Sequence, residues 1–145
     1  MTTFRGSCSC GAVRFEADAP AKFVAHCHCL NCRRAHGAGA VTWAGFPEAR
    51  FRITAGEGSL RHYRTETEAT RSFCGTCGST LLFSSPRWAG EMHVAVANLD
   101  DPIEPLPSGH AYADRAPDWF PIHDDLPQYG GESGMEPLQP GSDID

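Results

Sequence analysis

The chain lacks a long hydrophobic run. No apolar stretch among its 145 residues approaches the roughly 18 residues that a membrane-spanning helix needs. It also lacks the charged start and apolar segment of a secretory signal. These absences predict a cytoplasmic protein without membrane association. Thiols stay reduced in that compartment, so the seven cysteines are expected to bind metal or to act in catalysis. An odd number of cysteines also excludes complete disulfide pairing within one chain.

Basic residues are scarce in the last third of the chain. Residues 1–97 carry eleven lysines and arginines and seven acidic residues, whereas residues 98–145 carry one arginine and eleven acidic residues. The overall net charge of −6 argues against a nucleic-acid partner, which would require a basic surface. The arginines of the first part accompany the cysteines, where they could compensate the negative charge of metal-bound thiolates.

Glycine and proline divide the chain into short segments. Val13 and Phe15 alternate with polar residues in segment 11–17, which is typical of a half-buried strand. Further strands are predicted at residues 23–29, 40–43, 50–53, 60–64, 71–73, 79–83 and 92–97. Turns are predicted at residues 45–47, 56–58, 85–86 and 101–102, and one short helix at residues 31–35. This pattern predicts a mainly β fold of antiparallel sheets with at most one or two short helices.

The composition changes after Gly130 and Gly131. Residues 132–145 consist mostly of proline, glycine, serine and acidic residues. Such a segment has too little apolar surface to offset the entropy lost on ordering. The sequence therefore predicts one folded domain over residues 1–131 and a disordered acidic tail over residues 132–145.

All seven cysteines fall in three clusters. The two cysteines of the first cluster are separated by one residue, so in an extended segment both sulfurs would project from the same face. The third cluster is a Cys-x-x-Cys-Gly turn, in which two sulfurs converge. A structural zinc takes four such ligands in a closed tetrahedral site. These two clusters together predict a site that joins distant parts of the chain, with the ligands Cys8, Cys10, Cys74 and Cys77.

The middle cluster offers only three cysteines: Cys27, Cys29 and Cys32. Three protein ligands and an open position are typical of catalytic zinc, so this cluster is predicted to hold a second, catalytic ion. Arg33 and Arg34 follow directly and could offset the anionic centre or bind a substrate carboxylate. The alternative is a closed structural site, with a fourth ligand from one of four histidines: His26, His28, His36 or His62.

The segments that carry the cysteines resemble the glutathione-dependent formaldehyde-activating enzyme family, which also includes the centromere protein V type proteins. They are residues 6–15 (GSCSCGAVRF), 26–34 (HCHCLNCRR) and 73–78 (FCGTCG), followed by residues 107–110, 118–119, 126–127 and Tyr129. The resemblance covers about residues 4–130. It implies a β-tent fold stapled by a structural zinc at the first and third clusters, and a second zinc at the middle cluster.

The resemblance also implies an activity, the condensation of glutathione with formaldehyde to S-hydroxymethylglutathione. This is formally a carbon–sulfur lyase reaction, with a small thiol such as glutathione as the substrate. The second zinc would bind the thiol as thiolate or polarise the aldehyde oxygen. His26 and His28 are predicted to face away from the cysteines on their strand, which disfavours them as the acid that protonates the product. His36 lies beyond the cluster.

Two functions remain open on the sequence alone. One is an enzyme that acts on thiol–aldehyde adducts at a three-cysteine zinc. The other is a zinc-stapled β scaffold that binds a protein partner without catalysis. The fourth position of the middle cluster separates them: water or a thiol favours the enzyme, and a histidine favours the scaffold. The sequence does not indicate an oligomeric state.

Overall fold

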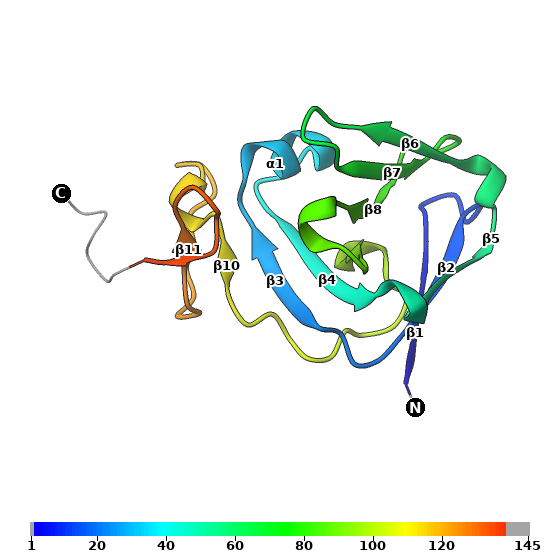
Figure 1. Cartoon of the computed structure of the whole chain (residues 1–145), viewed down its shortest axis with the longest axis horizontal. Helices are drawn as coiled ribbons and strands as arrows, with labels where there is room; N and C mark the ends of the chain where they lie inside the picture. Colours follow the sequence, from blue (N-terminus) through cyan, green and yellow to red (C-terminus); the bar gives the residue numbers. More distant parts are fainter. Residues whose placement is uncertain (1, 139–145) are drawn as a thin grey trace. The chain divides into compact units, whose positions relative to one another are not determined.

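The computed structural model describes residues 2–138, which form two compact units. The first unit contains the chain up to Phe23 and Trp43–Leu106, and the second contains Val24–Thr42 and the residues from Pro107 onward. Strands dominate the first unit, and within the described residues the only α-helix is α1 (Leu30–His36). The prediction of a mainly β fold with few helices is confirmed (Figure 1). No helix of the described part is long and apolar enough to cross a membrane.

A three-stranded antiparallel sheet lies in the first unit, in the order β1 (Thr3–Ser7), β2 (Arg14–Asp18) and β5 (Phe51–Ala55). Burial alternates along the strands, with Phe4 and Gly6 buried in β1 and Phe15 and Ala17 buried in β2. The Phe15 ring occupies the space that a side chain at position 6 would need. Strand β1 was not predicted, because Gly6 interrupts its apolar alternation.

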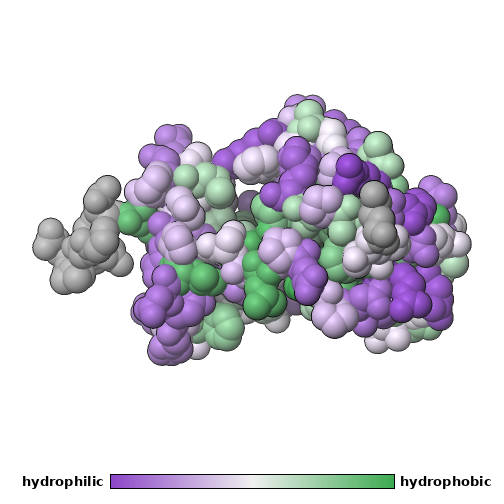
Figure 2. All heavy atoms as spheres, turned by 90° about the horizontal axis from the view of Figure 1, so that it is seen from below, coloured by the Kyte–Doolittle hydropathy of each residue, from purple (hydrophilic) through white to green (hydrophobic). Residues whose placement is uncertain are grey.

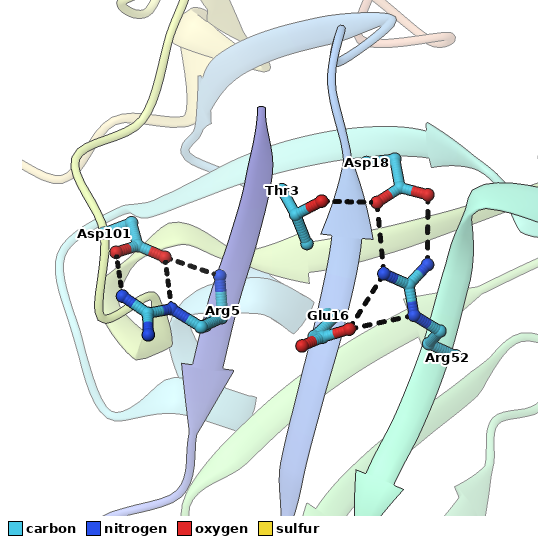
Figure 3. A network of polar contacts seen from close by, with 6 residues as sticks. All are labelled: Thr3, Arg5, Glu16, Asp18, Arg52 and Asp101. Atoms are coloured by element: carbon cyan, nitrogen blue, oxygen red, sulfur yellow. Dashed lines mark hydrogen bonds and ion pairs between the residues drawn. The ribbon is translucent and has the colours of Figure 1, made fainter. Parts of the chain in front are cut away.

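The outer face of this sheet carries ion pairs (Figure 3). The Arg52 guanidinium on β5 donates to Asp18 Oδ2 at 3.0 Å and lies 2.8 Å from Glu16 Oε1, both on β2. Arg5 on β1 makes a second pair with Asp101 at 3.0 Å. The hydrogen bond from Arg52 is the main reason that the pKa of Asp18 is lowered. Such exposed pairs fix strand register more than they add stability.

The larger antiparallel ladder of the first unit follows the order β4 (Val41–Pro47), β9 (Glu91–Ala95), β8 (Thr80–Ser84), β7 (Thr70–Cys74) and β6 (Leu60–Arg64). The predicted turn at residues 45–47 is wrong, because β4 continues to Pro47, which pairs with Glu91. The Phe23 ring packs where a Gly45 side chain would be, so this glycine serves close packing and not a turn. Pro47 stands at the strand end, where its missing N–H is tolerated.

The core of the first unit is built from aromatic and aliphatic side chains of these sheets. Phe4 and Phe46 pack with ring centroids 6.0 Å apart, and Leu81 and Val94 are fully buried. Burying one such side chain contributes about 1.5–3 kcal/mol. Val13 is equally buried and lies three residues after Cys10, so the core anchors the first cysteine cluster. Hydrophilic side chains cover much of the face seen in Figure 2, with smaller hydrophobic areas between them.

The second unit is built around β3 (Phe23–Cys27), whose His26 and Cys27 pair in parallel with β10 (His110–Ala111). Helix α1 follows β3 after two residues. Strands β11 (Tyr129–Gly130) and β12 (Glu136–Pro137) pair antiparallel. Residues 132–138 of the segment predicted as a tail are thus part of a hydrogen-bonded hairpin, and residues 139–145 lie outside the described residues.

Short 3₁₀ turns connect the strands. They are η1 (Glu48–Arg50), η2 (Glu57–Ser59), η3 (Pro86–Trp88), η4 (Val96–Asn98) and η5 (Ala113–Arg115). The predicted strand at residues 92–97 ends at Ala95, because η4 begins at Val96.

Replacing Gly56 with alanine should destabilise the first unit by about 2 kcal/mol or more. Gly56 has φ +76° and precedes η2, and a Cβ there would overlap the carbonyl oxygen of Ala12. The left-handed conformation and the overlap are both unfavourable for alanine. Urea unfolding measures the change. Gly58→Ala is the control, since nothing lies within 4 Å of its Cβ position. Equal stability of the two variants would contradict this account.

Candidate metal centres

Four cysteine sulfurs converge in the first unit. Cys8 follows β1 and Cys74 ends β7, and their sulfurs lie within 4.8 Å of each other and of those of Cys10 and Cys77. Cys10 Sγ lies 3.6 Å from Cys8 Sγ and 3.9 Å from Cys74 Sγ. Sulfurs around a tetrahedral zinc at about 2.3 Å are separated by about 3.8 Å. The spacing therefore fits zinc, and the predicted grouping of the first and third clusters is confirmed.

Backbone N–H groups point at these sulfurs. The Val13 N–H donates to Cys8 Sγ at 3.2 Å, and the Thr76 N–H donates to Cys74 Sγ at 3.4 Å. The turn after β7 is closed by a hydrogen bond from the Gly78 N–H to the Cys74 carbonyl, at 2.8 Å. Gly78 has φ +83°, which suits glycine. Although burial acts to raise it, the pKa of Cys8 is lowered by the hydrogen bond from Val13, which so favours the thiolate form that zinc binds.

The pKa values of two of these thiols, Cys10 and Cys77, are shifted in opposite directions. The Ser79 hydroxyl lies 3.2 Å from Cys77 Sγ and is the main cause that lowers the pKa of Cys77 to about 5. A backbone hydrogen bond from Ala12 lowers the pKa of Cys10, but the neighbouring Cys8 sulfur and burial raise it more, to about 11. Four thiolates this close repel one another, so full ionisation requires a cation between them.

The three cysteines of the middle cluster converge in the second unit. Cys27 is the last residue of β3, Cys29 is the N-cap of α1, and Cys32 lies in its first turn. Their sulfurs lie within 4.8 Å of one another. The strand predicted to continue to residue 29 ends at Cys27. Cys29 instead turns the chain into the helix, and its Sγ accepts from the Cys32 N–H at 3.3 Å. A strand end and a helix cap thus bring the sulfurs together.

The raised pKa of Cys27 indicates that this cluster, too, cannot ionise fully without a cation. The neighbouring sulfurs of Cys29 and Cys32 are the main causes that raise the pKa of Cys27, and burial raises it further. A divalent ion reverses this effect, because it stabilises thiolates directly.

Within the described residues, no fourth protein ligand joins the three cysteines. Among residues 2–138, no histidine or carboxylate belongs to either sulfur group. Of the histidines considered from the sequence, His26 Nδ1 lies 2.8 Å from Thr42 Oγ1, and His62 Nδ1 lies 2.7 Å from Ser72 Oγ. His28 bonds to another histidine, as described below. The three-cysteine group therefore has the ligand count of an open site.

A chain of polar side chains begins at His28, which lies between Cys27 and Cys29 in the sequence. His28 Nε2 lies 2.8 Å from His110 Nδ1, and His110 Nε2 lies 2.9 Å and 3.1 Å from the two oxygens of Asp124. Both His26 and His28 place their ring centroids 5.0 Å from that of His110. Burial is the main cause that lowers the pKa of His28, to about 4, followed by the nearby His110. His28 is therefore neutral at physiological pH.

Sequence reasoning missed His110 and Asp124. His110 is 82 residues beyond His28 and meets it through the two-residue strand β10, which is too short to leave a periodic pattern. The prediction that His28 faces away by strand alternation has no basis in the structure, because β3 ends one residue before it. The available sequence signal was His110, because it lies in segment 107–110, which is one of the segments that resemble the family.

The two arginines predicted to bind substrate differ in their contacts. The Arg33 Nε donates to the His28 carbonyl at 3.1 Å, and its Nη2 donates to the Arg115 carbonyl at 3.3 Å. The Arg34 side chain is exposed and, within the described part of the chain, makes no hydrogen bond or ion pair. Arg33 thus ties α1 to its surroundings, and Arg34 keeps its charge available.

The chain is similar to known proteins. The model of the family described as glutathione-dependent formaldehyde-activating enzyme matches residues 3–115. A Halomonas elongata protein provisionally named as such an enzyme is 31% identical over 126 residues, which cover 81% of this chain and 79% of that protein. An uncharacterized lyase of Schizosaccharomyces pombe is 28% identical over 89 residues, which cover 58% of this chain and 59% of the lyase.

The fold also matches a solved structure. A crystal structure of a Rhodobacter sphaeroides protein superimposes with a TM-score of 0.60 and 29% sequence identity, covering 71% of this chain and 97% of that one. The family match spans most of the chain and includes both cysteine groups. The chain belongs to the glutathione-dependent formaldehyde-activating enzyme family.

Proposed function

We propose that the protein is a zinc-dependent carbon–sulfur lyase that acts on adducts of a small thiol with an aldehyde. The reference reaction is the addition of glutathione to formaldehyde, which gives S-hydroxymethylglutathione. The observation that carries the proposal is the three-cysteine group, which has no fourth protein ligand among the described residues. Family membership and the names of the two relatives support the same reaction class.

Two metal sites are part of the proposal. Cys8, Cys10, Cys74 and Cys77 would hold a structural zinc, and the three-cysteine group would hold a catalytic one. A zinc ion bound by three cysteines supplies an open position for a thiolate and a Lewis acid for an aldehyde oxygen. Three thiolates outweigh its charge by one unit, and this favours basic residues around the site.

The chain's own residues bind and orient the reactants. In the addition, the S–H bond of the thiol breaks, a carbon–sulfur bond forms, and the proton ends on the former carbonyl oxygen, with no net oxidation. Arg34 lies two residues after Cys32 and would bind a carboxylate of the thiol substrate. Arg33 would keep α1, and with it Cys32, in place through the backbone of His28 and Arg115.

Replacing Arg34 with alanine should raise KM for glutathione about fivefold and leave kcat unchanged. An exposed charge pair contributes on the order of 1 kcal/mol, and the interaction is the same before and in the transition state. Initial rates with glutathione and with an uncharged thiol measure the effect. The uncharged thiol should show no change, and Arg34→Lys should keep most of the affinity. An equal loss with both thiols would contradict carboxylate binding by Arg34.

The activity itself is tested by exchange NMR with ¹³C-labelled formaldehyde and glutathione at equilibrium. The zinc-loaded protein should accelerate exchange of the label between free aldehyde and adduct above the spontaneous rate. The same protein after removal of its labile zinc should lose the acceleration. If the loaded protein accelerates no thiol–aldehyde pair, the enzymatic proposal is wrong and the scaffold interpretation takes its place.

A further inference from the structure

The four-cysteine group of the first unit is buried on one side and exposed on the other. Cys8 directly follows β1 and Cys74 ends β7, and these two residues are 4% and 0% exposed. Cys10 and Cys77, the second cysteine of each segment, are exposed residues. Each segment thus supplies one buried and one exposed sulfur, and solvent reaches the group through Cys10 and Cys77.

The chain around the two exposed cysteines is exposed as well. Ser9 lies at the surface beside Cys10, and residues 75–78 are exposed throughout. Ser79 joins the two segments, because its Oγ accepts a hydrogen bond from the Ser9 N–H at 2.9 Å and lies 3.2 Å from Cys77 Sγ. The contact between Ser79 and Cys77 is itself exposed. A small oxidant in solution can therefore reach the sulfurs on this side of the group.

The sulfurs are close enough for a small movement to join two of them. Cys10 Sγ lies 3.6 Å from Cys8 Sγ and 3.9 Å from Cys74 Sγ, and all four sulfurs lie within 4.8 Å of one another. A disulfide requires a separation of about 2.05 Å. Local opening of an exposed segment can supply the remaining shift, since it requires less free energy than global unfolding. An oxidised sulfur at Cys10 or Cys77 therefore has a partner sulfur beside it.

We propose that Cys10 and Cys77 are sites of oxidative modification, at which a peroxide attacks the four-cysteine group and causes the release of its zinc. This inference rests on the structural zinc of the proposed function, but it does not depend on turnover. Cysteines bind zinc as thiolates, and the thiolate is also the nucleophilic form of the side chain. The exposed ligands of the closed site are therefore its reactive positions.

The oxidation is balanced with hydrogen peroxide as the oxidant. An exposed thiolate attacks one peroxide oxygen, the O–O bond breaks, and the products are a sulfenic acid and a hydroxide ion. A neighbouring thiolate of the group then attacks the sulfenic sulfur, so that an S–S bond forms, the S–O bond breaks and a second hydroxide ion leaves. The two sulfurs together lose two electrons, and the peroxide takes them up. Two thiolates remain, which are too few to retain a structural zinc ion.

Peroxide treatment of the zinc-loaded Cys32→Ser variant tests this inference, because the four-cysteine group is then the complete sulfur group of the described chain. The dose is one that oxidises half of an equal concentration of free glutathione. A chromophoric chelator measures released zinc, and peptide mass spectrometry locates the disulfide. We expect loss of the zinc ion and one disulfide within the group that includes Cys10 or Cys77. Reduction with dithiothreitol and addition of zinc should restore the bound ion.

Trapping of sulfenic acid with dimedone in the unaltered, zinc-loaded protein gives a second readout. Within the four-cysteine group, the label should appear on Cys10 or Cys77, and the buried Cys8 and Cys74 are the internal controls. A label confined to the buried pair, a disulfide between Cys8 and Cys74, or zinc retained at this dose would each overturn the inference. Zinc is also counted before the peroxide is added. Absence of zinc at that stage would overturn the structural site itself, whereas zinc that is present and resists peroxide overturns this inference alone.

Discussion

Replacing Cys74 with serine should leave the first unit unfolded at room temperature, so that heating produces no cooperative unfolding transition. Cys74 is completely buried at the end of β7, and its sulfur lies 3.9 Å from that of Cys10. Structural zinc contributes on the order of 10 kcal/mol or more to small domains, which is comparable to the whole stability of an ordinary domain. Loss of one ligand exposes three uncompensated thiols and releases β7 from the loop after β1. Near-ultraviolet circular dichroism during heating measures the change.

Two control variants show whether the loss of stability is specific to the four-cysteine group. Ser79→Ala removes the hydroxyl that contacts Cys77 Sγ and the Ser9 N–H, but it leaves all four sulfurs in place. It should lower Tm only slightly, by the loss of two exposed hydrogen bonds. Cys32→Ser alters the other sulfur group and should leave the first unit folded. A Cys74→Ser variant that retains its zinc and a Tm near that of the unaltered protein would show that the four-cysteine group does not staple the fold.

Replacing Cys32 with alanine should lower thiol-dependent turnover about a thousandfold. The Lewis-acid contribution of a catalytic ion is several kcal/mol, and each 1.36 kcal/mol is a factor of ten in rate. Cys32 is a buried residue in the first turn of α1, where its N–H also donates to Cys29 Sγ. Its loss leaves two sulfurs, too few to retain the ion. Exchange NMR of the adduct and zinc analysis on the same sample measure both effects.

Asn31→Ala is the control for this experiment, because Asn31 is an exposed neighbour of Cys32 on the same helix. It should keep its zinc and its turnover within about twofold. Thiol-dependent turnover that survives in Cys32→Ala would rule out the three-cysteine group as the reaction centre. Loss of turnover without loss of zinc would assign Cys32 a role other than metal binding.

Residues with local periodicity were predictable from the sequence. Segment 60–64 coincides with β6 (Leu60–Arg64), because the glycine-containing turn predicted at residues 56–58 marks where the strand begins. The predicted helix at 31–35 is one residue shorter at each end than α1. Gly37 ends α1 in the left-handed conformation, as glycine commonly does. These elements depend on neighbouring residues, which the sequence shows directly.

The sulfur groups were predictable for a different reason. Zinc chemistry demands four ligands, so clusters of two, three and two cysteines allow few closed combinations. The structure brings together the set that the ligand count favours. The sulfurs of the middle cluster converge for a different reason, however. A strand was predicted to continue to residue 29, whereas Cys29 caps helix α1.

The polar chain from Asp124 to His28 was beyond the reach of the sequence. Its members come from three separate segments, and they meet through β10, which pairs with β3 over only two residues. Neither hydrophobic periodicity nor ligand counting predicts such a contact. The same holds for Arg33, whose guanidinium binds two backbone carbonyls. Only the three-dimensional arrangement separates its role from that of Arg34.

The central claim is that one closed and one open zinc site share this chain, and zinc per chain tests it most directly. The protein is purified without chelator, analysed for metal, and analysed again after zinc is added back and the excess removed. We expect two zinc ions per chain, one of which mild chelation removes while the fold is retained. A single tightly bound zinc, even after add-back, would contradict the second site and with it the proposed chemistry.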